Sequence, residues 1–301
     1  MKKWGIIFIL ALGVAIAIAN KIPLIHQDID APEESYDSQI SQVAAVPTAR
    51  PETMSNMQQK KITPDQVYQG NLLLVNAEYS LQENAEQQDI VQLSMHPDLV
   101  EGYALFDRTI RISKNVAYQL NKMITAASED GVNHFLLSSG YRDLDEQKKL
   151  YKDMGASYAL PAGSSEHNLG LSVDMGSTQK KMEDAPEGKW LAKHSAEYGF
   201  ILRYPKNKVD VTGIEFEPWH FRYVGLPHSL IMQKNEWVLE EYLDELQAKK
   251  QITFELKGKK YQINYYPYSR NLTVPVPKDR EYEVSGDNRG GVIVTIGQSN
   301  S

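Results

Sequence analysis

The sequence contains no cysteine. This absence excludes disulfide bonds, thiolate nucleophiles and every zinc site built on cysteine, so a bound metal must be held by histidine, aspartate or glutamate. A chain without thiols is insensitive to the redox state of its compartment, so the composition favours neither side of a membrane. The location of the protein must be predicted from its N-terminus.

The sequence also has fewer basic than acidic residues. The chain has 32 lysines and arginines against 39 aspartates and glutamates, which gives a net charge of -7 at pH 7. Proteins that bind nucleic acid usually present a basic face to the phosphates, so this balance argues against a nucleic-acid partner. The hydrophobic fraction of 42% and the charged fraction of 24% are typical of a globular protein.

Long hydrophobic runs are confined to the N-terminus. Lys2 and Lys3 precede an unbroken apolar run over residues 4–19, and the following "IPLI" extends it toward the roughly 20 residues that span a bilayer. The two lysines predict an N-terminus on the inside. We therefore predict an uncleaved membrane anchor over residues 1–25. The small residues 17–19 support the alternative of a cleaved signal segment, and both interpretations place the rest of the chain outside the cytoplasm.

Composition divides the remaining chain into three parts. Residues 26–61 are rich in proline, serine and acidic residues and poor in aromatics, so we predict a flexible tether. Residues 62–250 carry the patterns of a packed domain. Residues 251–301 alternate apolar and polar side chains between turn signals, which predicts a small β-rich C-terminal region. We interpret that region as a structural cap and not as a separate binding module.

The domain over residues 62–250 mixes helical and strand patterns. Helices are expected over 113–131, with Ser113 as N-cap, over 143–155, with Asp143 and Glu146 as a capping box, and as one long helix over 227–250. Strands are expected over 71–76, 134–140, 199–204 and 220–224. This irregular order predicts an α+β fold in which an antiparallel sheet is flanked by helices.

Two of the seven histidines lie close in sequence to a carboxylate and to a residue that bends the chain. His167 and Asp174 are seven positions apart, a distance of over roughly 20 Å when the chain is extended. Gly170 lies between them and provides a turn that brings the two together. In "EPWH", Pro218 disfavours a helix interior, so Glu217 and the following histidine must meet through a bend and not on one helical face.

Together these segments contain a set of side chains that zinc accepts. His167, Asp174 and His220 supply two imidazoles and a carboxylate and leave a fourth position for water, as a catalytic site requires. Glu217 would then be the general base that takes a proton from the attacking water. Glu166 is a competing ligand, but its neighbouring position on an extended chain predicts a side chain directed to solvent. Motif spacing alone leaves a chance arrangement open.

Three stretches carry a resemblance to a known family. "SSGYRDLDEQ", "SEHNLGLSVD" and "EPWH" occur in the order and spacing of the zinc D-alanyl-D-alanine carboxypeptidases of the VanY type, which are related to the VanX dipeptidases and share a hedgehog-like peptidase fold. The resemblance extends from about residue 65 to about residue 250, reaches into the C-terminal strands and includes the N-terminal anchor. It implies one zinc ion, with the ligands and base already named.

The resemblance also implies roles for residues that the spacing does not single out. Arg142, in the Ser-Gly-Tyr-Arg motif, resembles the cation that faces the substrate carbonyl or developing oxyanion. Gln147 and Ser165 resemble substrate-contacting positions. For an arginine without such a motif, a surface salt bridge would be the ordinary interpretation.

The implied function is removal of the terminal D-alanine from peptidoglycan precursor pentapeptides ending in D-Ala-D-Ala, which is tied to vancomycin-type resistance. An anchored enzyme would meet this substrate on the outer face of the membrane. One alternative is a cell-wall binding module with a structural or vestigial zinc site. Another is a serine peptidase, because residues 177–180 match Ser-x-x-Lys and 269–271 match its second box. No Lys-Thr-Gly follows, and we treat both matches as coincidence.

Overall fold

The computed structural model describes residues 56–155 and 159–298, so the predicted anchor and most of the predicted tether lie outside it. The helices are α1 (Lys114–Glu129), α2 (Leu144–Met154), α3 (Pro186–His194), α4 (Val209–Thr212), α5 (His228–Asn235) and α6 (Leu239–Lys249). The strands of the main domain are β2 (Ile90–Gln92), β3 (Tyr103–Leu105), β4 (Arg111–Ser113), β5 (Phe135–Ser139), β6 (Ser172–Ser177), β7 (Phe200–Leu202) and β8 (His220–Tyr223). Within the described ranges, no helix has the length and apolar character needed to cross a membrane.

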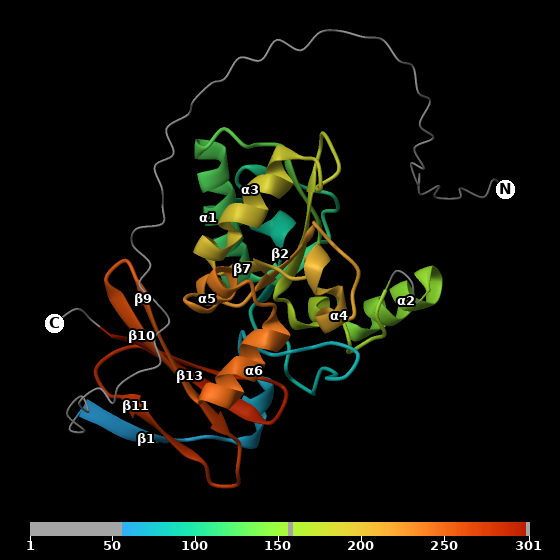
Figure 1. The fold of residues 1–301 in the computed structure, drawn as a ribbon. Helices are drawn as coiled ribbons and strands as arrows, with labels where there is room; N and C mark the ends of the chain where they lie inside the picture. Colours follow the sequence, from blue (N-terminus) through green and yellow to red (C-terminus); the bar gives the residue numbers. More distant parts are fainter. Residues whose placement is uncertain (1–55, 156–158, 299–301) are drawn as a thin grey trace, which may run out of the picture. The chain divides into compact units, whose positions relative to one another are not determined.

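A five-stranded sheet in the order β3-β5-β6-β8-β7 forms the centre of the main domain. Its strand pairs are antiparallel except for β3 and β5, which run parallel. Helices α1 and α3 lie together in Figure 1, and their apolar side chains share one core cluster with this sheet. The predicted α+β class with an antiparallel sheet and flanking helices is confirmed.

The central strands separate an apolar face from a polar one. Val173 on β6 and Phe221 on β8 are fully buried in the cluster that includes helices α1 and α3. Since successive side chains of a strand point to opposite faces, the next residue on β6, Asp174, and the preceding residue on β8, His220, point to the other face. The sheet therefore presents polar side chains on the face away from the helical core.

The first two helices begin as predicted. Ser113 caps α1 by accepting a hydrogen bond from the Val116 backbone N–H at 3.3 Å. Asp143 and Glu146 form the reciprocal capping box of α2, with both hydrogen bonds at 2.9 Å. These contacts satisfy N–H groups that the first turn of a helix leaves without partners.

The predicted long helix over residues 227–250 is wrong, because the chain forms two helices there. Glu236 has φ 54° and ends α5, and α6 starts at Leu239. The Trp237 backbone N–H donates to Met232 O, which closes the C-terminus of α5. No glycine or proline marks the break, and both helices carry apolar residues at helical spacing, so the pattern resembled one helix.

The predicted strand over residues 71–76 is also wrong. Its four apolar residues, 72–75, are all buried, but the segment joins no sheet. The Leu72 N–H donates to Ser285 Oγ at 2.9 Å and the Leu74 N–H to Asp287 O at 3.2 Å. A short apolar run shows only that the segment is buried. Here a side chain of β12 and a backbone carbonyl just after it accept these hydrogen bonds, in place of a strand ladder.

The C-terminal part contains a second, four-stranded sheet in the order β12-β13-β10-β9. Its strands are β9 (Gln251–Leu256), β10 (Lys259–Pro267), β12 (Tyr282–Gly286) and β13 (Gly291–Gln298), and they are accompanied by β11 (Thr273–Pro277). The β-rich content expected after residue 250 is therefore present.

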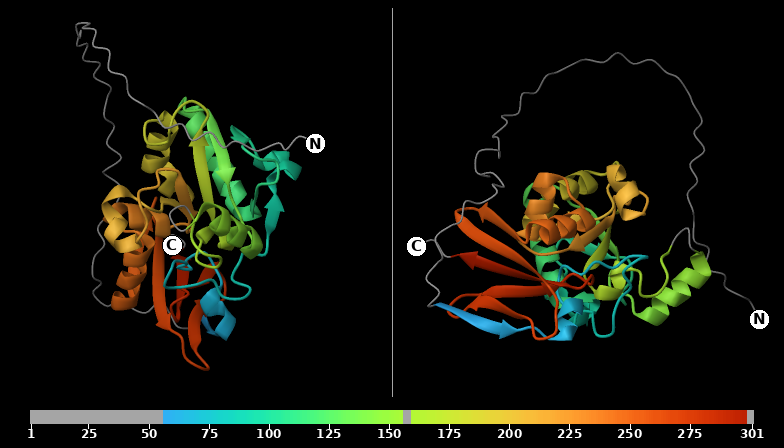
Figure 2. Two further views of the ribbon diagram at one scale, coloured as in Figure 1. Left: turned by 90° about the vertical axis from the view of Figure 1, so that its right-hand side faces the viewer. Right: turned by 60° about the horizontal axis from the view of Figure 1, so that its bottom comes forward.

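The predicted tether is too long at its C-terminal end. Residues 57–61 form strand β1 (Met57–Lys61), which pairs antiparallel with β11. Figure 2 shows the two strands side by side. The composition of β1, "MQQKK", concealed this pairing, because a strand in a two-stranded ladder is held by backbone hydrogen bonds and tolerates polar side chains on its exposed face.

Helices α5 and α6 pack against the C-terminal sheet. One apolar cluster joins Tyr242 and Leu246 of α6 to Phe254, Ile263 and other residues of β9, β10 and β13. His228, at the start of α5, is buried and hydrogen-bonded to Tyr242 Oη at 2.7 Å and to Thr295 Oγ1 on β13 at 3.1 Å. The core therefore continues across residue 250.

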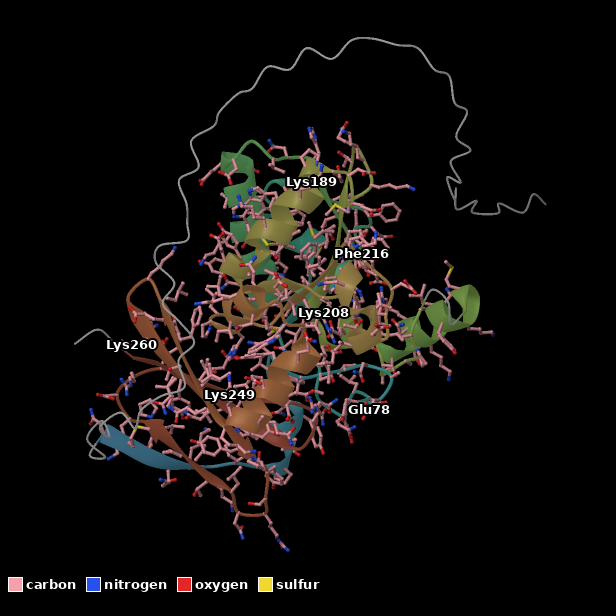
Figure 3. All side chains as sticks on the ribbon, in the orientation of Figure 1. Glu78, Lys189, Lys208, Phe216, Lys249 and Lys260 are labelled. Atoms are coloured by element: carbon pink, nitrogen blue, oxygen red, sulfur yellow. The ribbon has the colours of Figure 1, made fainter. Side chains whose placement is uncertain are left out.

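A polar contact fixes the other side of α6. Lys208, labelled in Figure 3, pairs with Glu241 of this helix at 2.8 Å. Glu241 also accepts a hydrogen bond from the Val238 backbone N–H and so caps the helix start. Helix α6 is thus attached both to the main domain and to the C-terminal sheet.

Candidate active site

His167 lies in a short 3-10 turn over Glu166–Leu169, and the turn predicted at Gly170 follows it. Gly170 has φ 78°, a left-handed conformation that side chains disfavour. A Cβ atom at this position would collide with the end of the Ile90 side chain. The glycine therefore allows both the backbone turn and the close packing that return the chain to β6.

Asp174 and His220 are direct partners in the β6–β8 ladder. Their side chains lie on the same face of the sheet, as cross-strand partners must. Glu217 precedes β8, and the His220 backbone N–H donates to Glu217 O at 3.3 Å. The predicted bend between these two residues is thus present, and it brings Glu217 next to the pair.

The three predicted metal ligands converge. Candidate ligand atoms of His167, Asp174 and His220 all lie within 4.8 Å of one another. His167 Nε2 is 3.3 Å from Asp174 Oδ2, and His220 Nδ1 is 3.0 Å from Asp174 Oδ1. Two imidazoles and one carboxylate form a set that suits zinc and leaves a coordination position open, so the side chains present fit this ion.

Burial and charge act differently on the two histidines. Burial lowers the pKa of His220, but hydrogen bonds to Asp174 and Glu166 outweigh it and raise the pKa to about 9. Burial and the nearby Arg142 charge lower the pKa of His167. Burial raises the pKa of Asp174, but the neighbouring histidines reverse this effect and lower it. The carboxylate is therefore ionised and available as a ligand.

Glu217 lies at the edge of the ligand cluster. Its Oε2 atom is 3.7 Å from His220 Nδ1, and 29% of its side chain is exposed. Burial raises the pKa of this carboxyl group, opposed by the charge of His220. A partly buried carboxylate with a raised pKa beside a metal site has the properties of a general base.

Arg142 lies in the same pocket and not in a surface ion pair. Its Nη1 donates to Ser139 Oγ at 2.7 Å, and its Nε donates to Gln147 Oε1 at 2.8 Å. The Gln147 amide in turn donates to Leu160 O at 2.7 Å. Among the hydrogen bonds of the described residues, none engages Arg142 Nη2, so this nitrogen can donate to a ligand in the pocket.

The pocket has a volume of about 670 Å³ and contains every predicted site residue. Its polar side is lined by Arg142, Gln147, Ser165, His167, Asp174, Glu217 and His220. Its apolar side includes Leu150, Leu160, Ile214, Phe216 and Trp219. Trp219 is 41% exposed, unusually high for a tryptophan, and lies directly before a candidate ligand. That Gln147 and Ser165 contact substrate stays a prediction.

The prediction that Glu166 faces solvent is wrong. Its side chain is fully buried and forms ion pairs with Arg203 at 2.8 Å and Arg222 at 2.7 Å. These charges outweigh the effect of burial and hold the pKa of Glu166 well below its usual range. The signal lay in the apolar strand patterns "FILRY" and "HFRYV", since a buried arginine requires a buried carboxylate.

Comparisons with known proteins identify similar D-Ala-D-Ala peptidases. The family model for VanY, D-alanyl-D-alanine carboxypeptidase, matches residues 109–226. A D-alanyl-D-alanine carboxypeptidase of Enterococcus faecium is 54% identical over 244 residues, which cover 81% of this chain and 80% of the relative. The bifunctional D-Ala-D-Ala dipeptidase and carboxypeptidase VanXYC of Enterococcus gallinarum is 34% identical, and the match covers 58% of this chain and 94% of that protein.

A solved structure extends the similarity to the fold. The vancomycin resistance D,D-dipeptidase VanXYg, in complex with a D-Ala-D-Ala phosphinate analogue, is 31% identical, with a TM-score of 0.70. The match covers 80% of this chain and 99% of that structure. With this fold, these relatives and this cluster of side chains, the chain belongs to the VanY family of D-alanyl-D-alanine carboxypeptidases.

Proposed function

We propose that this protein is a zinc-dependent D,D-carboxypeptidase that removes the terminal D-alanine from peptidoglycan precursors ending in D-Ala-D-Ala. The observation that carries the proposal is the convergence of His167, Asp174, His220, Glu217 and Arg142 in one pocket. Removal of this residue deprives glycopeptide antibiotics of the terminus they bind, so the activity would contribute to vancomycin-type resistance.

One zinc ion would be held by His167, Asp174 and His220. When bound there, it would polarise the scissile carbonyl and make water more acidic. The side chains of this protein account for the remaining requirements of hydrolysis. They must accept a proton, stabilise negative charge and hold the peptide in place.

Glu217 is suited to the proton transfers. It would accept a proton from the water that attacks the scissile carbonyl carbon, and would deliver that proton to the leaving nitrogen as the C–N bond breaks. One water is consumed, and the products are the shortened peptide and D-alanine. Burial, which raises the pKa of this group, helps it to act first as base and then as acid near neutral pH.

Arg142 is suited to stabilising the negative charge that develops on the substrate oxygen. Gln147 and Ser139 fix two of its nitrogens, so the guanidinium is already oriented toward the pocket before substrate arrives. A preorganised cation stabilises a developing oxyanion without further rearrangement. The same group would bind the carbonyl oxygen of the substrate less tightly than the oxyanion that forms from it.

The N-terminal segment supports a location at the membrane. Its lysines and long apolar run are the features of a single-pass anchor with the catalytic domain outside the cytoplasm, where peptidoglycan precursors are exposed. If so, the full-length protein should fractionate with membranes and be cleaved by protease added to intact protoplasts. Recovery in the culture medium would instead support a cleaved signal segment.

Product analysis on a muramyl pentapeptide tests the proposed reaction. Free D-alanine and the tetrapeptide should appear, the reaction should stop with a zinc chelator and return with added zinc, and penicillin should have no effect. Inhibition by penicillin with resistance to the chelator would contradict the zinc mechanism. Free D-Ala-D-Ala should be offered in parallel, because the similar VanXYC and VanXYg proteins are described as dipeptidases.

A further inference from the structure

The Glu166 carboxylate lies next to the candidate zinc site and is surrounded by buried donors. Its Oε1 atom accepts hydrogen bonds from Arg203 Nε at 2.8 Å and from Arg222 Nη1 at 2.7 Å. Its Oε2 atom accepts one from Ser172 Oγ at 3.2 Å. These three donors compensate the burial of the carboxylate and hold both of its oxygens in defined positions.

The same carboxylate faces the far side of a metal ligand. Glu166 Oε2 lies 3.5 Å from His220 Nε2, whereas Nδ1 of that ring faces Asp174 at 3.0 Å. His220 Nε2 is buried and has no closer partner among the described residues. If the ring binds a metal through Nδ1, its proton must lie on Nε2, where the Glu166 carboxylate at 3.5 Å can accept it.

His167 has the opposite arrangement. Its Nδ1 lies 2.6 Å from the carbonyl oxygen of Gly140, which accepts a hydrogen bond from this nitrogen. The proton of this ring is therefore on Nδ1, and Nε2, which is 3.3 Å from Asp174, is left to bind a metal. The two histidines thus present different nitrogens to one site, and each needs its own acceptor on the other side.

We propose that Glu166 is a positioning residue that fixes the His220 ring with its proton on Nε2 and so sets the affinity of the site for zinc. This inference rests on the zinc site of the proposed function. Partners of this kind hold the ring of a metal-binding histidine in orientation and make it a better ligand, and their loss typically weakens metal binding 10-fold to 100-fold. Arg203 and Arg222 act one step further away by holding the carboxylate.

A second carboxylate of the group provides a matched control. Glu240, on α6, pairs with Arg203 through two hydrogen bonds of 2.8 and 2.6 Å. It belongs to the same network and carries the same charge as Glu166, but its hydrogen bonds go to Arg203 and not to His220. The substitutions Glu166→Gln and Glu240→Gln therefore remove the same charge, and only the first changes the acceptor beside the ligand.

Zinc titration of the metal-free full-length protein against a competing chelator tests the proposal without relying on hydrolysis. Glu166→Gln should bind zinc 10-fold to 100-fold more weakly than the wild type, and Glu240→Gln should stay within about 3-fold of it. Circular dichroism must first show that both variants are folded. Wild-type affinity in folded Glu166→Gln, or an equal loss in both variants, would overturn the proposal.

A second measurement on the wild type keeps the test independent of variant folding. In the zinc-loaded protein, long-range proton–nitrogen NMR should find the His220 proton on Nε2 and the His167 proton on Nδ1. A His220 proton on Nδ1 would overturn the inference even if hydrolysis proceeds. Conversely, a protein with the expected protons and zinc affinity but no peptidase activity would contradict the proposed function alone.

Discussion

At the scale of single residues, side chains that are neighbours in the sequence face different partners and have different functions in the site. Glu166 and His167 are neighbours in the chain, yet one faces a pair of buried arginines and the other faces Asp174. Glu217 and His220 are three positions apart, and the bend between them leaves one carboxylate free to exchange protons while the histidine is held in the ligand cluster. The function of each side chain therefore depends on the direction in which it leaves the backbone.

Replacement of Glu217 tests the base assignment. Glu217→Gln keeps the size of the side chain and removes its ability to accept a proton, so we expect turnover to fall by about 100-fold to 10,000-fold. Zinc content, measured by atomic emission, should equal that of the wild type, because the proposed ligands are unchanged. A matched control is Asp210→Asn, an exposed acid on the short helix α4, which should retain activity.

Full turnover in Glu217→Gln would show that another group supplies the base. Loss of zinc together with activity would show instead that Glu217 is a ligand. A zinc-loaded Glu217→Gln protein that binds the pentapeptide but no longer hydrolyses it would identify the wild type as an enzyme. In a cell-wall binding module, the substitution would change neither binding nor product formation.

At the scale of elements, the helices α5 and α6 depend on one buried histidine. His228 connects α5 to Tyr242 on α6 and to Thr295 on β13 through its two ring nitrogens. Burial lowers the pKa of His228 to about 3, so the ring is neutral in the folded protein. In the unfolded chain a histidine gains its proton near pH 6.5.

The stability of the protein should therefore fall as the pH is lowered through this range. His228 contributes its full stabilisation above about pH 6.5, and this is progressively lost toward pH 3 as the unfolded state binds a proton that the folded state excludes. Each pH unit is worth about 1.4 kcal/mol, so the loss between pH 6.5 and 4.5 should be roughly 2–3 kcal/mol. Urea unfolding at the two pH values measures it.

The variant His228→Gln should be less stable at neutral pH but should lose less stability on acidification than the wild type. His134→Asn, at an exposed position with φ 74° that asparagine tolerates, should keep the wild-type dependence. An unchanged pH dependence in His228→Gln would contradict the role given to this histidine.

The elements also show what the sequence could and could not predict. Caps such as Ser113 and the pair Asp143 and Glu146 act within four residues, so the starts of α1 and α2 were predictable. The break at Glu236 was not, because no glycine or proline marks it and the two helices share one apolar cluster with the distant C-terminal sheet. Likewise, residue types and turns suggested the His-Asp-His set and the family resemblance supported it, whereas the burial of Glu166 depends on arginines 37 and 56 positions away.

At the scale of the whole molecule, the described chain is held together across the predicted boundary at residue 250. Leu72 and Leu74 share a cluster with Phe254 and Ile263. Asn288, in the loop before β13, donates to Leu74 O at 2.9 Å. An early segment of the chain is thus buried between the main domain and the C-terminal sheet.

A chain that ends after Lys250 should therefore fail to fold, although all residues of the candidate site are present. Truncation exposes Tyr242, Leu246 and the rest of the shared cluster, and each large apolar side chain left without cover costs about 2–3 kcal/mol. Soluble expression and urea unfolding measure the effect, with the full chain expected to unfold in one transition. A soluble, active truncated protein would show that the β-rich region is a separate domain.

The direct pairing of Asp174 with His220 has a consequence for the order of events during folding. A slip of one residue between β6 and β8 would turn one of the two side chains to the opposite face of the sheet and take it out of the cluster. A refolding chain should therefore acquire tight zinc binding only after these strands have paired in the native register. The time course of zinc binding would then report when the two strands pair. Bound zinc would stabilise the native register and would not stabilise a shifted one.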